Sequence, residues 1–423
     1  MRKLTSISFI NPDKIGLNLF FGRIPGRIKK LYLIIGATLL ISYDSFWFGT
    51  SGIHIFEIIR NLFVLTLPIS LFLTDRDIKL SQVNLKIFVS LILFFQIESI
   101  FNGITFGAPT IILSGILLAF ALIHKYSLRE VASCFSKLMQ IISIYSIIVL
   151  VGVLIGCISF KIIDNGVSEN IVTAWGCVFF PEIESQLVRN SAFFREPGVF
   201  MVMINLSIIF ELFLIRDLNL WRNVGILVIT QLTLLSTGGI FCMGMIFLTY
   251  FIRSIKGVFN IVIIATITTI LITLFVDNTI IDFVFGKFEN IDSSGSGFAR
   301  YSSLLIPLNI YLENPILGSG DMFPTDYVRI GHELFHRYVN PSGMSTNTIA
   351  NAFAIWGTLY GFFLLYGLFK FSKVLGKKRG HLISLFLLID IILLLSNESM
   401  PYWPFLYIFI FYGLSHNKSI AYK

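Results

Sequence analysis

The chain alternates between long apolar runs and short polar connections. A helix that crosses a membrane needs roughly 17–25 predominantly apolar residues, and most of the runs reach this length. We therefore predict about twelve membrane-spanning helices, over residues 30–48, 54–73, 84–101, 104–123, 138–160, 198–215, 223–237, 239–253, 258–276, 346–369, 382–396 and 401–414. The seventh and eighth runs are short and meet at Ser236–Gly239, so an alternative interpretation merges or drops one of them.

The composition agrees with this pattern. Of the 423 residues, 55% are hydrophobic and only 13% are charged, and the mean hydropathy is +0.83. A soluble domain cannot bury so much apolar surface, whereas a lipid bilayer covers it. The sequence thus predicts an all-α polytopic membrane protein in which residues 1–423 form one integral membrane domain. The net charge of +8 does not indicate nucleic-acid binding, because the basic residues lie in short loops.

Lysine and arginine are distributed unevenly between the two sets of alternate connections. Most of the 32 basic residues lie in one set, which includes both ends of the chain. The other set contains Lys161, Arg189, Arg195, Lys287, Arg300, Arg329 and Arg337. Because cytoplasmic loops carry the excess of positive charge, we expect both termini in the cytoplasm.

Two connections on the outer side are long, at about residues 161–197 and 277–345. Long loops between packed elements are usually functional or disordered. The second loop contains an amphipathic pattern, with apolar residues at helical spacing at Tyr301, Leu304, Leu305, Leu308, Tyr311 and Leu312. This pattern predicts a helix that lies in the outer membrane interface and stops at Asn314–Pro315.

The segment Arg195-Glu196-Pro197-Gly198 opens the sixth predicted span. The start of that helix faces outward, where its free N–H groups and positive dipole end favour anions. Arg195 adds a guanidinium whose planar fork suits phosphate oxygens, and Glu196 could orient it or accept a proton. In the alternative interpretation, Glu196 only caps the helix and Arg195 extends to lipid headgroups.

Charged residues also occur inside the predicted spans. Asp44, Arg60 and Glu98 each lie in the outer third of a predicted helix. Ionisable groups within a bilayer are costly and usually pair, so we expect these three to meet and form the floor of a cavity. Asp390 is a further possible partner of Arg60. The alternative is a structural salt bridge that holds the bundle together.

The stretch His332–His336, HELFH, matches the H-E-x-x-H spacing with which zinc proteases hold their metal. Against a zinc site, Gly331 precedes the motif, Pro341 follows it, and the sequence offers no evident third ligand. The four cysteines are scattered without a CxxC pair. We therefore expect no metal and keep a zinc membrane protease as an alternative.

Several short motifs follow one another in the second half of the chain. FFREPGVF opens a predicted span, and LLSTGG lies at an outer turn. R-x-x-x-L-x-x-P then precedes ENPILGSG, and NTIANAFAIWGTLYG opens a later span. From about Asn190 to Gly361 the sequence resembles the bacterial O-antigen polymerase family, whose members polymerise oligosaccharide repeat units and are related to the O-antigen ligases.

The resemblance implies a glycosyltransferase in the bacterial plasma (inner) membrane, with its active site on the periplasmic or extracellular side. It would move a growing glycan from undecaprenyl diphosphate onto the non-reducing end of the next lipid-linked repeat unit. The product would be lipopolysaccharide O-antigen, capsule or another surface glycan. The expected partners are undecaprenyl-diphosphate-linked oligosaccharides, the lipid bilayer and a chain-length regulator, and no cofactor is expected.

The resemblance also implies that outer arginines bind the diphosphate, because preorganised guanidinium groups stabilise developing negative charge. Arg195 and Arg300 lie in the best-matched stretches. Arg329 and Arg337 flank the HELFH motif, and Arg189 is the remaining candidate. A hydroxyl acceptor also needs a proton acceptor. The candidates for this catalytic base are Glu196, His332 and His336.

Two related functions compete with this interpretation. An O-antigen ligase shares the donor, but that branch typically has a histidine just ahead of the asparagine that opens the late span. Here Ser345 and Thr346 precede Asn347, which favours a polymerase. A flippase for lipid-linked oligosaccharides would line a central path with polar residues, whereas the polar residues here concentrate in the outer loops.

Overall fold

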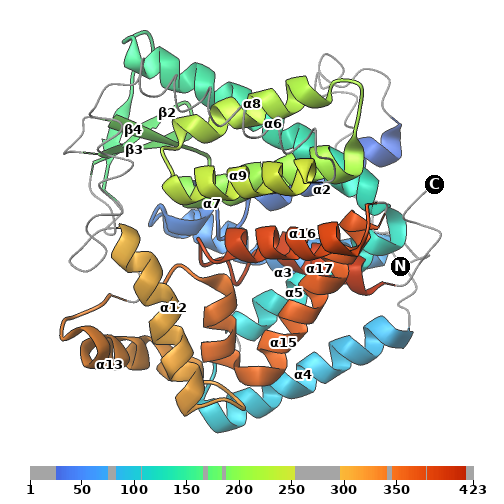
Figure 1. Cartoon of the computed structure of the whole chain (residues 1–423), viewed down its shortest axis with the longest axis vertical. Coiled ribbons are helices and arrows are strands. Elements are labelled where there is room, and N and C mark those ends of the chain that lie inside the picture. Colours follow the sequence, from blue (N-terminus) through green and yellow to red (C-terminus); the bar gives the residue numbers. More distant parts are fainter. Residues whose placement is uncertain are drawn as a thin grey trace, which may run out of the picture.

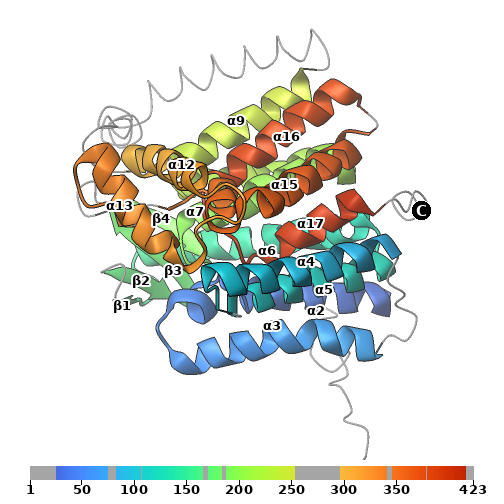
Figure 2. The ribbon, with the colours of Figure 1, turned by 90° about the horizontal axis from the view of Figure 1, so that it is seen from below.

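The computed structural model describes residues 25–74, 82–105, 107–164, 170–182, 187–252, 296–340, 345–377 and 379–415. These residues form a mostly helical bundle in which many helices run roughly side by side (Figure 1, Figure 2). Within the described residues, six helices are long and apolar enough to cross a membrane. They are α3 (His54–Thr74), α4 (Gln82–Asn102), α5 (Gly107–Lys125), α6 (Leu128–Leu154), α7 with its π-helical continuation η3 (Pro197–Ile215), and α15 (Thr348–Gly376). At this level, the prediction of a helical membrane protein is confirmed.

Other predicted spans form shorter helices. These are α2 (Gly26–Leu40), α8 (Leu220–Thr233), α9 (Thr237–Phe251), α16 (His381–Leu395) and α17 (Pro404–Leu414). The uncertain seventh and eighth runs are therefore two separate helices, α8 and α9. The ninth predicted span, 258–276, lies outside the described residues. α17 lies in the core, because its side chains are almost all buried and it packs against α5 and α15.

Two helix boundaries differ from the predicted ones for local reasons. α6 starts at Leu128 rather than at residue 138, because Ser127 and Glu130 form a capping box at its start. α2 ends at Leu40 rather than continuing to residue 48. A short polar segment follows it, and then the π-helical turn η2 (Phe46–Thr50).

The first of the two long connections predicted to lie outside contains a four-stranded antiparallel sheet, which the all-α prediction missed. Its strands are β1 (Lys161–Ile163), β2 (Ile171–Ala174), β3 (Cys177–Glu182) and β4 (Leu187–Ala192), hydrogen-bonded in sequence order. One face packs Cys177 and Phe179 against Val149 at the end of α6. The other face packs Val178 against Phe46 of η2. The sheet is therefore held between two helical elements of the bundle.

The second of these long connections contains the predicted amphipathic helix, α12 (Ser296–Glu313), which ends just before Asn314–Pro315 as expected. The 3₁₀ turn η4 (Gly320–Met322) and α13 (Phe323–Phe335) follow it. The core-facing side of α12 carries the buried residues Phe298, Ile306 and Ile310. The predicted apolar stripe points the other way, with Tyr301, Leu304, Leu308 and Leu312 exposed. An apolar face that the described residues leave uncovered suits a membrane interface, and that location stays a prediction.

Candidate functional site

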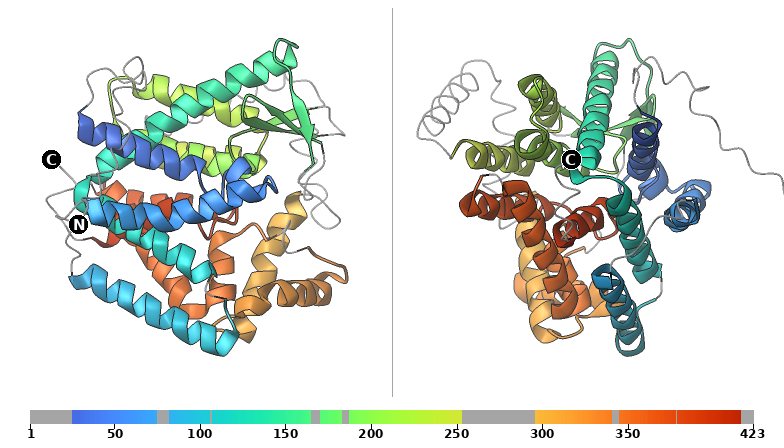
Figure 3. Two further views of the ribbon diagram at one scale, coloured as in Figure 1. Left: turned by 180° about the vertical axis from the view of Figure 1, so that it is seen from behind. Right: turned by 90° about the vertical axis from the view of Figure 1, so that its right-hand side faces the viewer.

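Several helix ends meet beside the sheet and α12, at one end of the bundle (Figure 1, Figure 3). α7, α9 and α15 begin there, and α16 ends there. The segment after α2 reaches the same place, because Ser45 and Phe194 form an antiparallel bridge. Arg195 N donates to Asp44 O at 3.0 Å, which fixes the backbone on both sides of that bridge.

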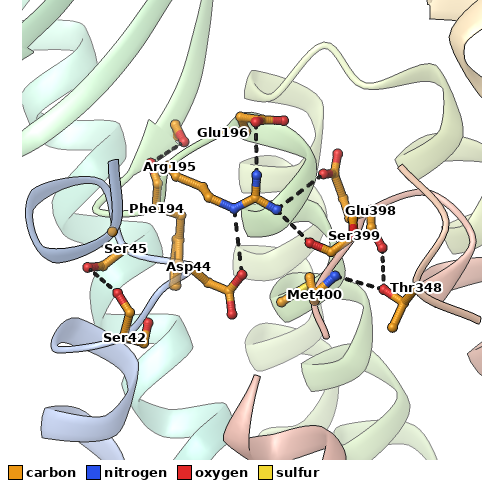
Figure 4. A network of polar contacts seen from close by, with 12 residues as sticks. Ser42, Asp44, Ser45, Phe194, Arg195, Glu196, Thr348, Glu398, Ser399 and Met400 are labelled. Atoms are coloured by element: carbon orange, nitrogen blue, oxygen red, sulfur yellow. Dashed lines mark hydrogen bonds and ion pairs between the residues drawn. The ribbon is translucent and has the colours of Figure 1, made fainter. Parts of the chain in front are cut away.

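The Arg195 guanidinium is the centre of a polar network at this place (Figure 4). Its Nε atom lies 3.6 Å from Asp44 Oδ1, and its Nη1 atom donates to Glu196 Oε1 at 3.0 Å. Its Nη2 atom donates to Ser399 O at 2.8 Å and lies 4.0 Å from Glu398 Oε2. Glu196 thus contacts Arg195, as the interpretation in which it orients the guanidinium requires, and its functional role stays a prediction. Glu196 occupies the N-cap position of α7 without a side-chain capping hydrogen bond.

Glu398 reaches the start of α7 from the connection between α16 and α17. Its carboxyl group lies directly over Gly198, so a Cβ atom at that position would overlap it. The first turn of α7 begins with Pro197 and has the positive end of the helix dipole. Glycine at position 198 thus allows a carboxyl group to approach the helix N-terminus closely.

Backbone contacts hold Glu398 in place. Thr348 N donates to Glu398 O at 3.2 Å, and the Thr348 hydroxyl also donates to that oxygen. Met400 N donates back to Thr348 Oγ1 at 2.8 Å. The first turn of α15 therefore fixes the connection that carries Glu398. Asn347 caps this helix by accepting from Ile349 N and Ala350 N.

Arg300 reaches the same place from α12. Its Nη1 atom lies against Gly238 in the first turn of α9, together with Asn397 Oδ1, and leaves no room for a Cβ atom there. Thr346 Oγ1 donates to Ser303 Oγ at 3.3 Å, which ties α12 to the start of α15. The two glycine-containing motifs, REPG and STGG, thus have the same role, since each lets a charged side chain touch a helix N-terminus.

We call the charged residues gathered here the Arg195 cluster, which consists of Asp44, Arg189, Arg195, Glu196, Arg300 and Glu398. The pKa values in this cluster depend on burial and on its arginines. Burial raises the pKa of Glu398 to about 8, Glu196 adds to this shift, and Arg195, Arg300 and Arg189 oppose it. Burial also raises the pKa of Asp44 to about 6 against the attraction of Arg195. Burial alone would lower the pKa of Arg195, but its three carboxyl neighbours raise it.

The pKa of Arg300 is shifted downward, whereas that of Arg195 is shifted upward. Burial lowers the pKa of the Arg300 guanidinium, and the nearby Glu398 only partly offsets this effect. Within the described residues, Arg300 forms no ion pair, whereas Arg195 has three carboxyl partners. Arg189 on β4 donates to Leu234 O at 3.2 Å and acts electrostatically on both Glu398 and Arg300. The cluster therefore contains partly buried positive charge, and on the Arg300 side no carboxylate of the described residues forms an ion pair with it.

The remaining predicted arginines lie along α12. Arg337 stacks over the Phe298 ring at 3.4 Å, close to the N-terminal end of α12 and to Arg300. Arg329 instead pairs with Glu313 at the other end of α12. Since α-helices rise 1.5 Å per residue, Glu313 lies about 20 Å from Arg300 along the axis. Arg329 is therefore not part of the cluster around Arg195.

The HELFH motif lies at the C-terminal end of α13. His332 and His336 are both exposed, and His336 ends the helix with a left-handed backbone. The carboxylate of Glu333, the residue between them in the motif, forms an ion pair with Arg329. Among the described residues, no three His, Cys, Asp or Glu side chains are grouped as a metal site would require.

The three residues expected to form a cavity floor are not brought together. Asp44 joins the Arg195 network. Arg60 donates to the backbone carbonyls of Phe48 and Gly49 and stacks over Tyr43. Glu98 accepts from Asn102, which also donates to Leu317 O and Gly318 O. Asp390 on α16 faces Thr249 of α9 instead of Arg60.

Glu398 is the central residue that the sequence analysis missed. The available signal was the polar triplet Asn397-Glu398-Ser399 between two apolar runs. Comparison of the sequence with protein-family models and with curated proteins finds no match. The geometry of the site combines partly buried guanidinium groups with a buried carboxyl group, Glu398, whose pKa is raised to about 8.

Proposed function

We propose that this chain is an oligosaccharide repeat-unit polymerase of a bacterial plasma membrane. It transfers a growing glycan from undecaprenyl diphosphate onto the next lipid-linked repeat unit. The observation that carries the proposal is the juxtaposition of buried Glu398 and Arg300, a partly buried guanidinium without an ion-pair partner in the described residues. The sequence resemblance to the O-antigen polymerase family supports the same assignment.

The two arginines have different roles in this proposal. The charge of Arg195 is already balanced by three carboxyl groups, so this residue positions Glu196 and Glu398. Arg300 instead retains a charge that burial makes costly, and a diphosphate would relieve that cost. Arg189 adds positive charge on the sheet side. We therefore assign the diphosphate to the Arg300 side of the cluster.

Glu398 is the proposed proton acceptor. The acceptor hydroxyl oxygen forms a bond to the anomeric carbon of the donor, while the bond from that carbon to the diphosphate breaks. The hydroxyl proton passes to the Glu398 carboxylate, and undecaprenyl diphosphate leaves with the bonding electron pair. A base whose pKa of about 8 lies near the working pH is well matched to this step. Glu196, which is half exposed, contacts Arg195 and is placed here as a positioning residue.

The proposed orientation places the Arg195 cluster outside the cell, with about twelve spans and both termini in the cytoplasm. A cysteine-free background allows this to be tested with single exposed cysteines. Tyr301→Cys on α12 should react with a membrane-impermeant maleimide in intact cells, whereas Lys86→Cys on α4 should react only after lysis. Labelling in the opposite sense would reject the orientation and with it the reaction.

The activity itself is tested by deleting the protein from its host and analysing the surface glycan. We expect the deletion strain to make only single-repeat glycans, and the wild-type chain or Arg329→Gln to restore long polymers. Arg300→Gln should fail to restore them at equal protein level. Long polymers that accumulate on the lipid carrier in the deletion strain would instead identify a ligase.

A further inference from the structure

A pocket of about 590 Å³ lies at the other end of the bundle from the Arg195 cluster. It is formed where α2 and α6 begin and α5 ends. α6 connects the two regions, because it starts at this pocket and its far end packs on the sheet. The basic residues that line the pocket come from three helices and are Arg27, His124, Lys125 and Arg129.

The polar side of the pocket is built from fixed groups. Arg27 Nη2 donates to Lys125 O and to Glu130 Oε2, and its guanidinium lies 5.2 Å from the Tyr126 ring centroid. Glu130 is the acidic residue in the lining, and its carboxylate accepts from Ser127 N at 2.7 Å in the capping box of α6. The carboxylate is therefore engaged by the helix start and by Arg27, so the basic groups dominate the opening.

Arg129 completes the basic rim from the next turn of α6. Its Nη2 atom donates to Ile215 O at 2.9 Å and lies 3.7 Å from Asp217 Oδ1. Both Arg129 and Asp217 are more than half exposed, so this ion pair is weakly held and leaves the guanidinium accessible to a further anion.

The other side of the pocket is apolar. Ile28, Tyr32 and Cys134 contribute to its lining, below the basic rim. On the neighbouring outer surface of α2, the Leu33 side chain is 48% exposed. The pocket thus joins a cationic opening to apolar surface that a bilayer would cover. A soluble phosphate would use only the first of these features, whereas a phospholipid would use both.

We propose that this pocket binds the phosphate headgroup of an anionic membrane lipid, with an acyl chain lying along α2. The headgroup contacts the rim formed by Arg27, Lys125 and Arg129. This lipid would occupy the bilayer leaflet opposite to the Arg195 cluster. The proposal does not depend on the reaction assigned to that cluster.

The full-length protein can test the proposal in nanodiscs that contain phosphatidylglycerol and phosphatidylcholine in equal amounts. Native mass spectrometry of the released protein counts the lipids that it retains. We expect the wild type to retain one phosphatidylglycerol, and the Lys125→Gln/Arg129→Gln variant to retain it about tenfold less, since each basic residue near a membrane surface contributes substantially to anionic-lipid attraction. The matched control is Lys86→Gln, an exposed lysine at the start of α4 outside the pocket.

Three results would overturn the proposal. The first is equal retention of the two lipids by the wild type. The second is an equal loss of phosphatidylglycerol in Lys86→Gln, which would indicate general surface charge. The third is displacement of the lipid by millimolar inorganic pyrophosphate, which would reject the lipid in favour of a soluble phosphate compound. If the double variant unfolds, the single Arg129→Gln variant, which removes an exposed ion pair and one hydrogen bond to Ile215 O, carries the test with the same expected direction.

Discussion

Two arginines, Arg195 and Arg329, each contact three carboxyl groups, yet their surroundings differ. The Arg329 side chain is 43% exposed, and its partners lie on the surfaces of α12 and α13. Those partners are Glu313, Asp326 and Glu333. The Arg195 side chain is only 18% exposed, and its partners come from three separate connections in the chain. They are Asp44, Glu196 and Glu398.

The difference shows that the number of ion pairs an arginine forms does not indicate how much they contribute to stability. Exposed pairs are screened by water and contribute little, typically less than about 1 kcal/mol. A buried network is costly to desolvate, and removal of one member leaves the others unpaired. The Arg195 network also joins the segment after α2, the start of α7 and the connection before α17. It therefore has a structural consequence that the Arg329 network lacks.

The largest expected effect is that of Arg195→Met. This change leaves buried Asp44 and Glu398 without their shared guanidinium, and loss of one partner from a buried ion pair costs about 3 kcal/mol or more. We expect a loss of that size in the free energy of unfolding, measured by SDS titration in mixed micelles. Arg329→Met is the matched change. Equal destabilisation by the two substitutions would remove the distinction between the networks.

The next effect concerns activity rather than stability. Arg300→Gln removes the proposed diphosphate-binding charge, and loss of one preorganised electrostatic group typically lowers the rate about 10²- to 10³-fold. We expect such a loss in an assay with purified protein and lipid-linked repeat units. Arg300→Lys should recover part of the rate, since it keeps the charge but not the planar fork.

Arg300→Gln should also be nearly as stable as the wild type, because Arg300 has no ion-pair partner to strand within the described residues. If Arg329→Gln lowered the rate and Arg300→Gln did not, the anion site would instead lie at the exposed end of α12, beside Arg329.

Part of this arrangement was predictable from the sequence. The apolar runs predicted the helices, since a continuous apolar run of this length has few other stable structures in a membrane. The pairing of Arg195 with Glu196 and the helix start at Pro197 followed from adjacent residues. Arg300 was placed on a helix by the spacing of apolar residues around it. Each of these predictions depends on residues close together in the chain.

The missed features depend on contacts between distant residues. Glu398 lies in a short connection without periodicity, and its importance arises only where the starts of α7 and α15 meet it. α2 stops at Leu40 because the polar segment that follows it pairs with Phe193–Arg195. The strands of the sheet are short, and β1 and β2 have only 3 and 4 residues, too few to give a clear alternation.

A smaller effect should appear in the pH dependence of the reaction. Glu398 can accept a proton only when ionised, and its pKa is about 8, so kcat/KM should rise with pH and level off above this value. Glu398→Gln should lower the rate about 10²-fold and abolish the rising limb. Glu398→Asp should keep the limb, and Glu333→Gln in the exposed network should change neither rate nor profile. A rising limb that persists in Glu398→Gln would assign the base to another residue.

The smallest effect is expected in the Arg329 network, and it completes the comparison. Arg329→Met should change the free energy of unfolding by less than about 1 kcal/mol, because all of its partners can be hydrated when it is lost. Whatever effect remains should shrink as salt is added, since exposed charges are screened within about 10 Å at 0.1 M ionic strength. The effect of Arg195→Met should be nearly independent of salt, because its partners Asp44 and Glu398 are buried. Parallel unfolding titrations of both variants at low and high salt would measure this contrast. An equal dependence on salt in the two variants would mean that water reaches the Arg195 cluster as freely as it reaches the surface of α13.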